Sequence, residues 1–415
     1  MALPYASCHA PPPFRFRLIW TLMLSLPSRP FAALSTPGPL VLALLYSLEA
    51  FARSLMATVI PLQAYALLKD AAGVSALYSA VGICGLALSF AIPALIRLTR
   101  RRHVYRLGGA SLILSALLIA TSTLVGQAGG MLARIFGVAC LNVTFNLYLT
   151  DLVERRNLVW AEPLRLAFSA GAWTLGPFLG VWLQSRWGIG AAAIASVGCA
   201  IALLIYFTHL RLGERIPRTS QPPPVAPWSS IPRFIKQPRL RLGWVIPFGR
   251  SCWWSVLFTF GPIAMVSHGA TQTTGAALVS LSNALLFLGP LFGRLGARLG
   301  LRITIIGSFI LLSIATIAAG LVHDSTTLMV LLLIGSIFTT QLDAVGNIPF
   351  LRAVRASERA EMVTVFRTYI DLSDLIPVAV FTVLLRFLPM ETVFIVTGAA
   401  MLVFAGFARY VPRGM

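Results

Sequence analysis

Phe51-Ala-Arg-Ser54 in the first half of the chain returns 197 residues later as Phe248-Gly-Arg-Ser251. The same offset aligns ALSFAIPALIRLTRR (87–101) with ALLFLGPLFGRLGAR (284–298), and seven of these fifteen positions are identical. A duplication of apolar segments on this scale is typical of membrane transporters that are built from two related helical bundles. The sequence therefore predicts two pseudo-symmetric halves.

The composition places the chain in a lipid bilayer. Of its 415 residues, 57% are hydrophobic and only 11% are charged, which would expose far too much apolar surface in water. Long continuous apolar stretches favour helices over barrel strands. We expect an all-α polytopic membrane protein with twelve transmembrane helices near 39–62, 73–96, 107–125, 130–150, 166–183, 189–208, 243–266, 274–293, 303–322, 327–350, 362–385 and 390–408.

A change of composition separates the two halves. Residues 210–242 collect prolines among arginines and serines, so we expect a cytoplasmic linker with a short interfacial helix around Trp228–Lys236. The apolar run Leu18–Leu26 imitates a secretory signal peptide, but its removal would strip the first helix of its basic flank, and we expect an interfacial segment instead. The predicted parts are an N-terminal extension (1–37), two six-helix bundles (38–209 and 243–410), the linker between them and a C-terminal tail (411–415).

The placement of the basic residues attributes the net charge of +20 to the topology of the chain in the membrane rather than to binding of a nucleic acid. If the N-terminus is cytoplasmic, the cytoplasmic loops and tails hold 26 of the 33 Lys and Arg residues, and only Lys69, Arg186 and Arg386 fall on the other side. This asymmetry is the positive-inside pattern. It predicts a multi-pass protein of the cytoplasmic (inner) membrane, with both termini cytoplasmic and with anionic membrane lipids as partners.

Nothing in the sequence predicts a cofactor or a metal site. The five cysteines have no paired spacing, and the five histidines lie at helix ends, in loops or in the N-terminal tail. The chain also has no Gly-rich phosphate loop, so the energy for transport would come from a solute or ion gradient. We expect a protein that is not an enzyme and that acts as a monomer.

Two short motifs carry a resemblance to a known family. The segment Gly289-Pro-Leu-Phe-Gly293-Arg-Leu-Gly-Ala-Arg298, and its weaker partner Ile92-Pro-Ala-Leu-Ile96-Arg-Leu-Thr-Arg-Arg101, resemble the cytoplasmic loop motif of the Major Facilitator Superfamily. The resemblance covers residues 38–410 and implies twelve helices in two bundles around a central cavity. It also implies that Arg97, Arg101, Arg294 and Arg298 are gating residues, although Ile96 and Gly293 replace the Asp of the family's motif.

Two further motifs resemble this family more loosely. Arg134-Ile-Phe-Gly137 resembles an arginine motif that the family associates with proton movement. Gly171 and the segment Gly176-Pro-Phe-Leu-Gly180 resemble a motif of its antiporters. The alternative is that these small residues only allow helices to pack closely.

Charges inside the predicted helices need an explanation, since each costs roughly 2.5 to 3.5 kcal/mol to insert. Arg367, Asp371 and Asp374 form one stripe of the eleventh helix, at i, i+4 and i+7. A carboxylate in a helix bundle can take up and release protons as access alternates. Our candidates for proton coupling are, in order, Asp343, Asp374 and Asp371, with Glu49, Arg134 and Arg367 as further participants.

The repeat also pairs polar residues that the resemblance would place at a central cavity. Asn142 and Asn146 correspond, at an offset of 201, to Asp343 and Asn347. Arg53 and Arg250 occupy equivalent positions of the first and seventh helices, and two guanidinium groups could grip an anion. The alternative is structural pairing of both arginines with Glu49 and with the acids of the tenth and eleventh helices. The predicted substrate-binding residues are Arg53, Arg250, Asn142, Asn146, Asn347, Trp253 and Trp254.

These observations predict a secondary active transporter for a small organic solute, with an anionic solute and proton coupling as the finer expectation. An alternative with the same fold is a proton-driven exporter of apolar drugs, which would have an uncharged aromatic cavity. Alternatives from other classes are a membrane-embedded lipid-modifying enzyme and a non-transporting receptor.

Overall fold

The structure, a computed structural model, describes residues 39–152, 158–210, 227–355 and 358–412. All of these belong to one unit, Gly38–Met415, and every regular element within them is a helix. The predicted N-terminal extension (1–37) lies outside the described residues.

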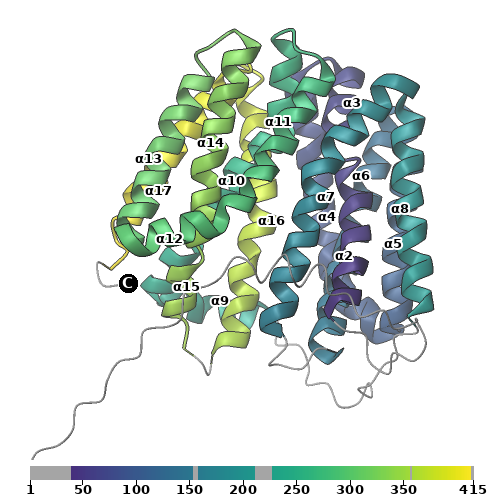
Figure 1. Cartoon of the computed structure of the whole chain (residues 1–415), viewed down its shortest axis with the longest axis horizontal. Helices are drawn as coiled ribbons and strands as arrows, with labels where there is room; N and C mark the ends of the chain where they lie inside the picture. The colour runs from purple at the N-terminus through teal and green to yellow at the C-terminus, as the bar shows by residue number, and fades with distance from the viewer. Residues whose placement is uncertain (1–38, 153–157, 211–226, 356–357, 413–415) are drawn as a thin grey trace, which may run out of the picture. The chain divides into compact units, whose positions relative to one another are not determined.

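The first half of the chain folds into helices that lie together on one side of Figure 1. They are α2 (Pro39–Ser54), α3 (Val59–Leu68), α4 (Ala71–Leu98), α5 (Arg101–Ala120), α6 (Leu124–Leu152), α7 (Leu158–Trp187) and α8 (Ile189–His209). A turn at residues 55–58 separates α2 from α3, so the first predicted transmembrane helix is broken.

The second half lies on the other side of Figure 1. Its helices are α10 (Pro238–Ser267), α11 (Gln272–Ala284), the 3₁₀ turn η2 (Leu285–Leu288), α12 (Gly289–Leu299), α13 (Leu301–Ala319), α14 (Ser325–Val345), α15 (Ile348–Ala353), α16 (Arg359–Leu384) and α17 (Thr392–Ala408). Helix α9 (Pro227–Lys236) precedes them, within the range predicted as a linker. Helix α10 begins earlier than expected, so residues 238–242 are helical rather than linker.

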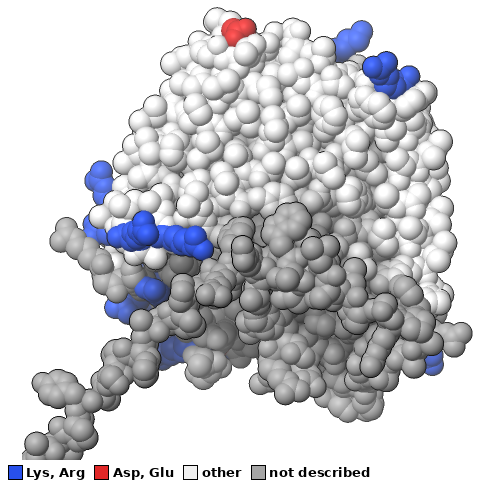
Figure 2. All heavy atoms as spheres, viewed as in Figure 1, with Lys and Arg blue, Asp and Glu red and all other residues white. Residues whose placement is uncertain are grey.

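The described helices agree with an all-α membrane fold. Eight stretches among them are long and apolar enough, by length and composition, to cross a membrane. Helix also fills the other predicted ranges, in α7, α10, α16 and α17. On the face drawn in Figure 2, a broad described area between the charged residues of the upper rim and the Lys and Arg residues on the left carries no Lys, Arg, Asp or Glu, as a lipid-facing surface requires. The number of crossings, twelve, stays a prediction.

The duplication is visible in the residues that begin equivalent helices. Asp70 and Thr271 lie 201 positions apart, and each accepts a hydrogen bond from a backbone N–H in the first turn of the helix that follows, α4 or α11. Thr123 and Asp324 lie 201 positions apart as well and do the same at α6 and α14. Each cap satisfies an N–H group that the helix itself leaves unpaired. The repeat therefore keeps the position of the cap while it exchanges Asp for Thr.

Two glycines of α7 pack closely against the point where the first predicted helix is broken. A Cβ atom on Gly176 would collide with the Ser54 side chain, and one on Gly180 would collide with the carbonyl oxygen of Leu55. Gly171, by contrast, has open space around it. Close packing thus accounts for Gly176 and Gly180 without any appeal to an antiporter motif.

The two halves contact each other through α4 with α16 and through α7 with α11. The Ser75 hydroxyl donates to the carbonyl of Val378 over 2.7 Å, and Ser79 and Thr382 share a hydrogen bond of 2.8 Å. A small apolar cluster of Ala64, Val74 and Ile263 also joins the halves. These contacts lie toward the end of the helices that carries the loop at residues 69–70.

Candidate functional site

A cavity of about 330 Å³ lies between the two halves. Its size is within the range of small-molecule sites. The first half contributes the break after α2 and parts of α3, α4, α6 and α7, and the second half contributes α10, α11 and α16. The described residues that line it are Ala57, Thr58, Ile60, Tyr78, Val81, Gly82, Gly85, Leu86, Met131, Arg134, Ile135, Trp173, Ser255, Phe258, Thr259, Val279, Asp371, Asp374 and Leu375.

Charges of opposite sign line opposite walls of this cavity. Arg134 of α6 comes from the first half, and Asp371 and Asp374 of α16 come from the second. Arg134 donates from Nη2 to the backbone carbonyl of Arg53 over 2.7 Å, which uses one of its five N–H donors. Asp371 and Asp374 are exposed to the cavity and form no hydrogen bond or ion pair with the residues that the structure describes.

Aromatic rings complete the wall between the halves. The ring of Trp173 in α7 stacks on that of Phe258 in α10, with centroids 6.1 Å apart and an interplanar angle of 26°. Phe258 stacks in turn on Trp254, at 5.3 Å. Sequence reasoning missed Trp173, Phe258 and Tyr78, because a single aromatic residue in an apolar helix does not reveal which way it faces.

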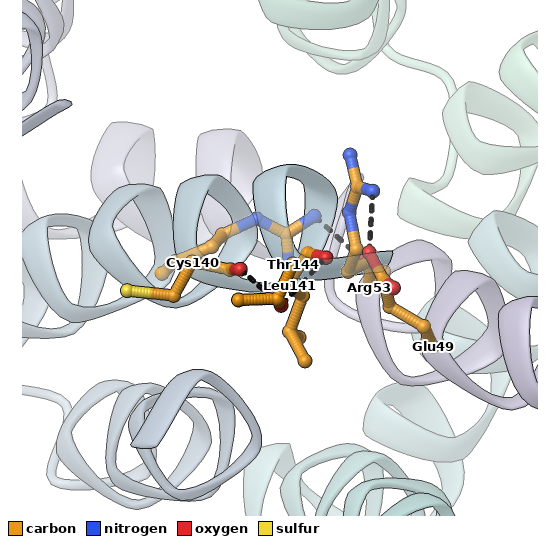
Figure 3. Close-up of polar contacts among 6 residues, drawn as sticks. Glu49, Arg53, Cys140, Leu141 and Thr144 are labelled. Atoms are coloured by element: carbon orange, nitrogen blue, oxygen red, sulfur yellow. Dashed lines mark hydrogen bonds and ion pairs between the residues drawn. The ribbon is translucent and has the colours of Figure 1, made fainter. Parts of the chain in front are cut away.

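Arg53 is paired within its own helix. Its Nη1 lies 3.2 Å from Oε1 of Glu49, one turn earlier on α2, as Figure 3 shows. The Glu49 side chain is fully buried, and Arg165 of α7 also lies within electrostatic range of it. The guanidinium of Arg53 lies 5.9 Å from the centre of the Trp173 ring, close to the cavity wall. Glu49 therefore neutralises much of the charge that could have faced an anion.

Arg250 is paired across helices. Its Nε lies 3.0 Å from Oδ1 of Asp343 on α14, close enough for an ion pair although the two atoms are not aligned as a hydrogen bond. Its Nη2 donates to the hydroxyl of Tyr369 over 3.3 Å. The indole N–H of Trp254 donates to the other oxygen of Asp343 over 2.9 Å. Asp343, our first candidate for proton coupling, is thus held by two partners in its own half.

The other predicted binding residues lie apart from the cavity. Trp253 is 1% exposed in the core of the second half and donates to Thr316 over 2.9 Å. Asn142 and Asn146 are half-buried on α6, and Asn347 precedes α15 with its side-chain oxygen buried. None of these four is among the described residues that line the cavity.

The four arginines of the loop motifs differ in their surroundings. Arg101 is buried at the start of α5, whereas Arg294 and Arg298 are exposed on α12. The side chain of Arg97 lies outside the described residues. Arg367 is exposed on α16, one turn before Asp371 and within electrostatic range of it. A role in gating or coupling for any of them stays a prediction.

Sequence comparison finds no relative, since neither a protein-family profile nor a curated protein sequence matches the chain.

Solved structures do match the fold. A POT family transporter in complex with 5-aminolevulinic acid aligns with a TM-score of 0.69 at 14% identity, over 92% of this chain and 97% of that one. The nucleoside transporter NupG aligns with a TM-score of 0.68 at 16% identity, over 90% and 98%. A bacterial homologue of the iron transporter ferroportin, in an inward-facing state, aligns with a TM-score of 0.67 at 13% identity, over 89% and 97%.

All of these neighbours are described as transporters. They share one architecture and very little sequence, so the likeness concerns the fold. The resemblance drawn from the loop motifs and the repeat is confirmed at that level: the chain has the fold of the Major Facilitator Superfamily.

Proposed function

We propose that the chain is a secondary active transporter of the cytoplasmic membrane, and that its solute binds in the cavity between the halves. The observation that carries this proposal is the arrangement of Arg134 on one wall and Asp371 and Asp374 on the other. A site built from both halves changes its access when the halves rock against each other. Neighbours with the same fold move peptides and nucleosides, which supports a small organic solute.

The charges of the cavity favour a dipolar solute, one that carries an anionic and a cationic group. Arg134 offers a planar fork of donors that suits a carboxylate, and the α16 acids suit an ammonium group. A purely anionic solute would face two carboxylates. The arginines first considered for an anion, Arg53 and Arg250, each have an acid partner in their own half.

An exporter of apolar drugs fits this cavity less well. Each charged side chain held in the bilayer costs roughly 2.5 to 3.5 kcal/mol. An apolar solute would leave the two acids, and the donors of Arg134 that do not bind the Arg53 carbonyl, without polar partners from the solute. A peptide conjugate and 5-aminolevulinic acid were bound by neighbouring structures, and an amino acid such as the latter carries both kinds of group.

The positive-inside pattern indicates from which side of the membrane the cavity is reached. It makes the loop at residues 69–70 external, and the described contacts between the halves lie toward that end. The proposed state is therefore closed to the outside, with access to the cavity from the cytoplasm.

Asp374 is the proposed proton carrier. It is exposed to the cavity, it has no ion-pair partner among the described residues, and it lies within electrostatic range of Asp371 and Arg53. A proton on Asp374 would remove a charge that the solute's ammonium group otherwise balances, so solute and proton binding would be linked. Asp343 is less suited, because Arg250 and Trp254 already hold its carboxylate.

The test starts with thermal shifts of the purified protein against amino acids, dipeptides, simple carboxylates and simple amines, since a ligand stabilises the folded state according to its affinity. We expect dipolar compounds to raise the melting temperature most. The best of them is then used in proteoliposomes. Arg134→Lys should weaken its binding about 10-fold or more, because Lys loses the planar fork. Asp374→Asn should abolish accumulation driven by a pH gradient while solute exchange continues.

Arg386→Lys is the matched control, since Arg386 is exposed outside the cavity and should leave binding unchanged. Stabilisation by simple carboxylates alone would overturn the dipolar solute. Accumulation by Asp374→Asn that still follows the pH gradient would remove Asp374 from the coupling mechanism. Failure of every compound to be taken up would overturn the transporter itself.

A further inference from the structure

Three loops of the second half bring two histidines and a glutamate together. His268 ends α10, His323 precedes α14, and Glu391 precedes α17. Their candidate ligand atoms all lie within 4.8 Å of one another. From the sequence we expected no metal site, because the histidines fall at helix ends, in loops or in the N-terminal tail. The three residues lie 55 and 68 positions apart along the chain. The fold alone makes them neighbours.

The orientation of His268 is set by the backbone. Its Nδ1 lies 2.8 Å from the carbonyl oxygen of Ala264, and a carbonyl oxygen can only accept a hydrogen bond. Nδ1 therefore carries the proton, which leaves the lone pair of Nε2 free in the neutral ring. A histidine whose other nitrogen donates to a carbonyl is the usual arrangement at a metal centre.

This arrangement leaves a gap that a cation would fill. The free Nε2 of His268 faces Oε1 of Glu391 at 3.9 Å, too far for a hydrogen bond. Two lone pairs that face each other repel unless a proton or a metal ion lies between them. The His323 ring lies nearly parallel to that of His268, at 17° and 6.3 Å between centroids, which brings a third donor to the same point.

We propose that His268, His323 and Glu391 bind a divalent transition-metal ion of the Zn²⁺ class. Two imidazoles and a carboxylate suit Zn²⁺, and a water molecule would complete four-coordination. Bonds of about 2.0 to 2.2 Å place tetrahedral ligands roughly 3.3 to 3.5 Å apart, so the cluster must contract by about 1 Å. His323 is exposed and Glu391 half-buried, so rotation of their side chains can supply this movement.

The surroundings offer room and mixed charge. The cluster lies in a hollow of about 490 Å³, where Lys69 and Asp70 of the first half form the opposite wall. The ammonium group of Lys69 works against a cation. The Asp70 carboxylate favours one, although both of its oxygens already cap α4. This site is independent of the proposed solute and of the transport cavity.

The test uses the full chain, purified on an affinity tag without histidines and stripped with a chelator. Zn²⁺ is titrated in competition with a chromophoric chelator, and Co²⁺ binding is followed by its absorption spectrum. We expect one tight Zn²⁺ per chain, with no competition from Mg²⁺, which prefers oxygen ligands. His323→Ala and Glu391→Gln should each weaken Zn²⁺ binding about 100-fold or more, because the loss of a ligand costs at least as much as the loss of an outer-shell partner, which costs about 10- to 100-fold.

The controls are His209→Ala, at the end of α8, and Cys84→Ser, which removes an exposed thiol that could bind Zn²⁺ by itself. Both should bind Zn²⁺ as the parent does. The metal-free melting temperature of each variant shows whether it is folded. Equal Zn²⁺ affinity in the parent, His323→Ala and Glu391→Gln would overturn the site. So would the absence of saturable Zn²⁺ binding in the parent, which would leave only an ion pair of protonated His268 with Glu391.

Discussion

Arg53 and Arg250 occupy equivalent positions of the duplicated halves, yet their partners differ. Arg53 is neutralised by Glu49 on its own helix, whereas Arg250 is neutralised by Asp343 on α14 and also donates a hydrogen bond to the hydroxyl of Tyr369 on α16. The first pair ties a helix to itself, and the second ties three helices together. The duplication therefore preserved the position of a cation but not the way in which its charge is balanced.

This difference explains which charged side chains face the cavity. With both arginines paired inside their halves, the acids that face the cavity are those of α16, and the cation opposite them is Arg134. Pseudo-symmetry is thus a good guide to the backbone and a poor guide to the site.

The largest expected effect comes from the pair that ties helices together. Asp343→Asn leaves Arg250, whose side chain is only 7% exposed, without its counter-charge. The loss of one partner of a buried ion pair costs about 3 to 5 kcal/mol of unfolding free energy. Glu49→Gln should cost less, because Arg53 is 18% exposed and lies within electrostatic range of Asp374. Equilibrium unfolding of the purified protein in detergent gives the order of the two variants.

The double variant Arg250→Leu with Asp343→Leu is the control for that comparison. Removal of both charges should recover most of the stability lost by Asp343→Asn, since paired apolar residues need no counter-charge. If Glu49→Gln were the more destabilising change, the local pair of α2 would be the more important one, contrary to our expectation.

An intermediate loss of stability is expected when alanine replaces a glycine that allows two helices to pack closely. Gly180→Ala would push a methyl group into the carbonyl of Leu55, and backbone cannot turn aside. Overpacking of this kind costs about 1 to 3 kcal/mol. At Gly249 of α10 a Cβ would lie 2.6 Å from the Phe404 ring, which can rotate, so Gly249→Ala should cost less. Gly171→Ala, with open space around it, is the control that should leave the melting temperature unchanged.

The smallest expected change in stability concerns the helix N-cap residues, which are Asp in one half and Thr at the equivalent position of the other. The backbone N–H and the hydroxyl of Thr327 donate to the Asp324 carboxylate over 2.7 and 2.8 Å, and these hydrogen bonds lower its pKa. The stabilisation is therefore present above the unfolded pKa, about 3.9, and is lost as the pH falls through the lower folded value. The difference in melting temperature between the parent and Asp324→Thr should be constant near neutral pH and should shrink below about pH 4.

The reciprocal variant checks this assignment. Thr123 is the equivalent cap in the first half and does not titrate, so Thr123→Asp should introduce the same kind of acid sensitivity there. A difference for Asp324→Thr that persists unchanged to pH 3, well below the ordinary Asp pKa, would mean that the cap contributes through its shape rather than its charge.

The sequence was sufficient for the fold because hydropathy and an internal repeat are properties of the chain itself. It also found Asp371 and Asp374, since charges inside apolar helices are rare enough to stand out. It offered the pairing of Arg250 with an acid of the tenth or eleventh helix only as an alternative to anion binding, because it could not show that Arg250 and Asp343, 93 positions apart, face each other. Nor could it find Trp173 and Phe258, because helices that are apolar on all sides give no indication of which face meets a cavity.

Gly176 and Gly180 of α7 pack closely against Ser54 and Leu55, where α2 ends and the break begins. Helix α7 and the break should therefore move together. Helix α7 also packs along α11 of the opposite half. Ala57 and Thr58, in the break itself, line the cavity. A tilt of α7 would therefore move the break as well, because Gly180 lies too close to the Leu55 carbonyl for even a methyl group to fit between them. In the transport cycle that we propose, a movement of α7 would therefore change the wall of the cavity at the same time as the boundary between the halves.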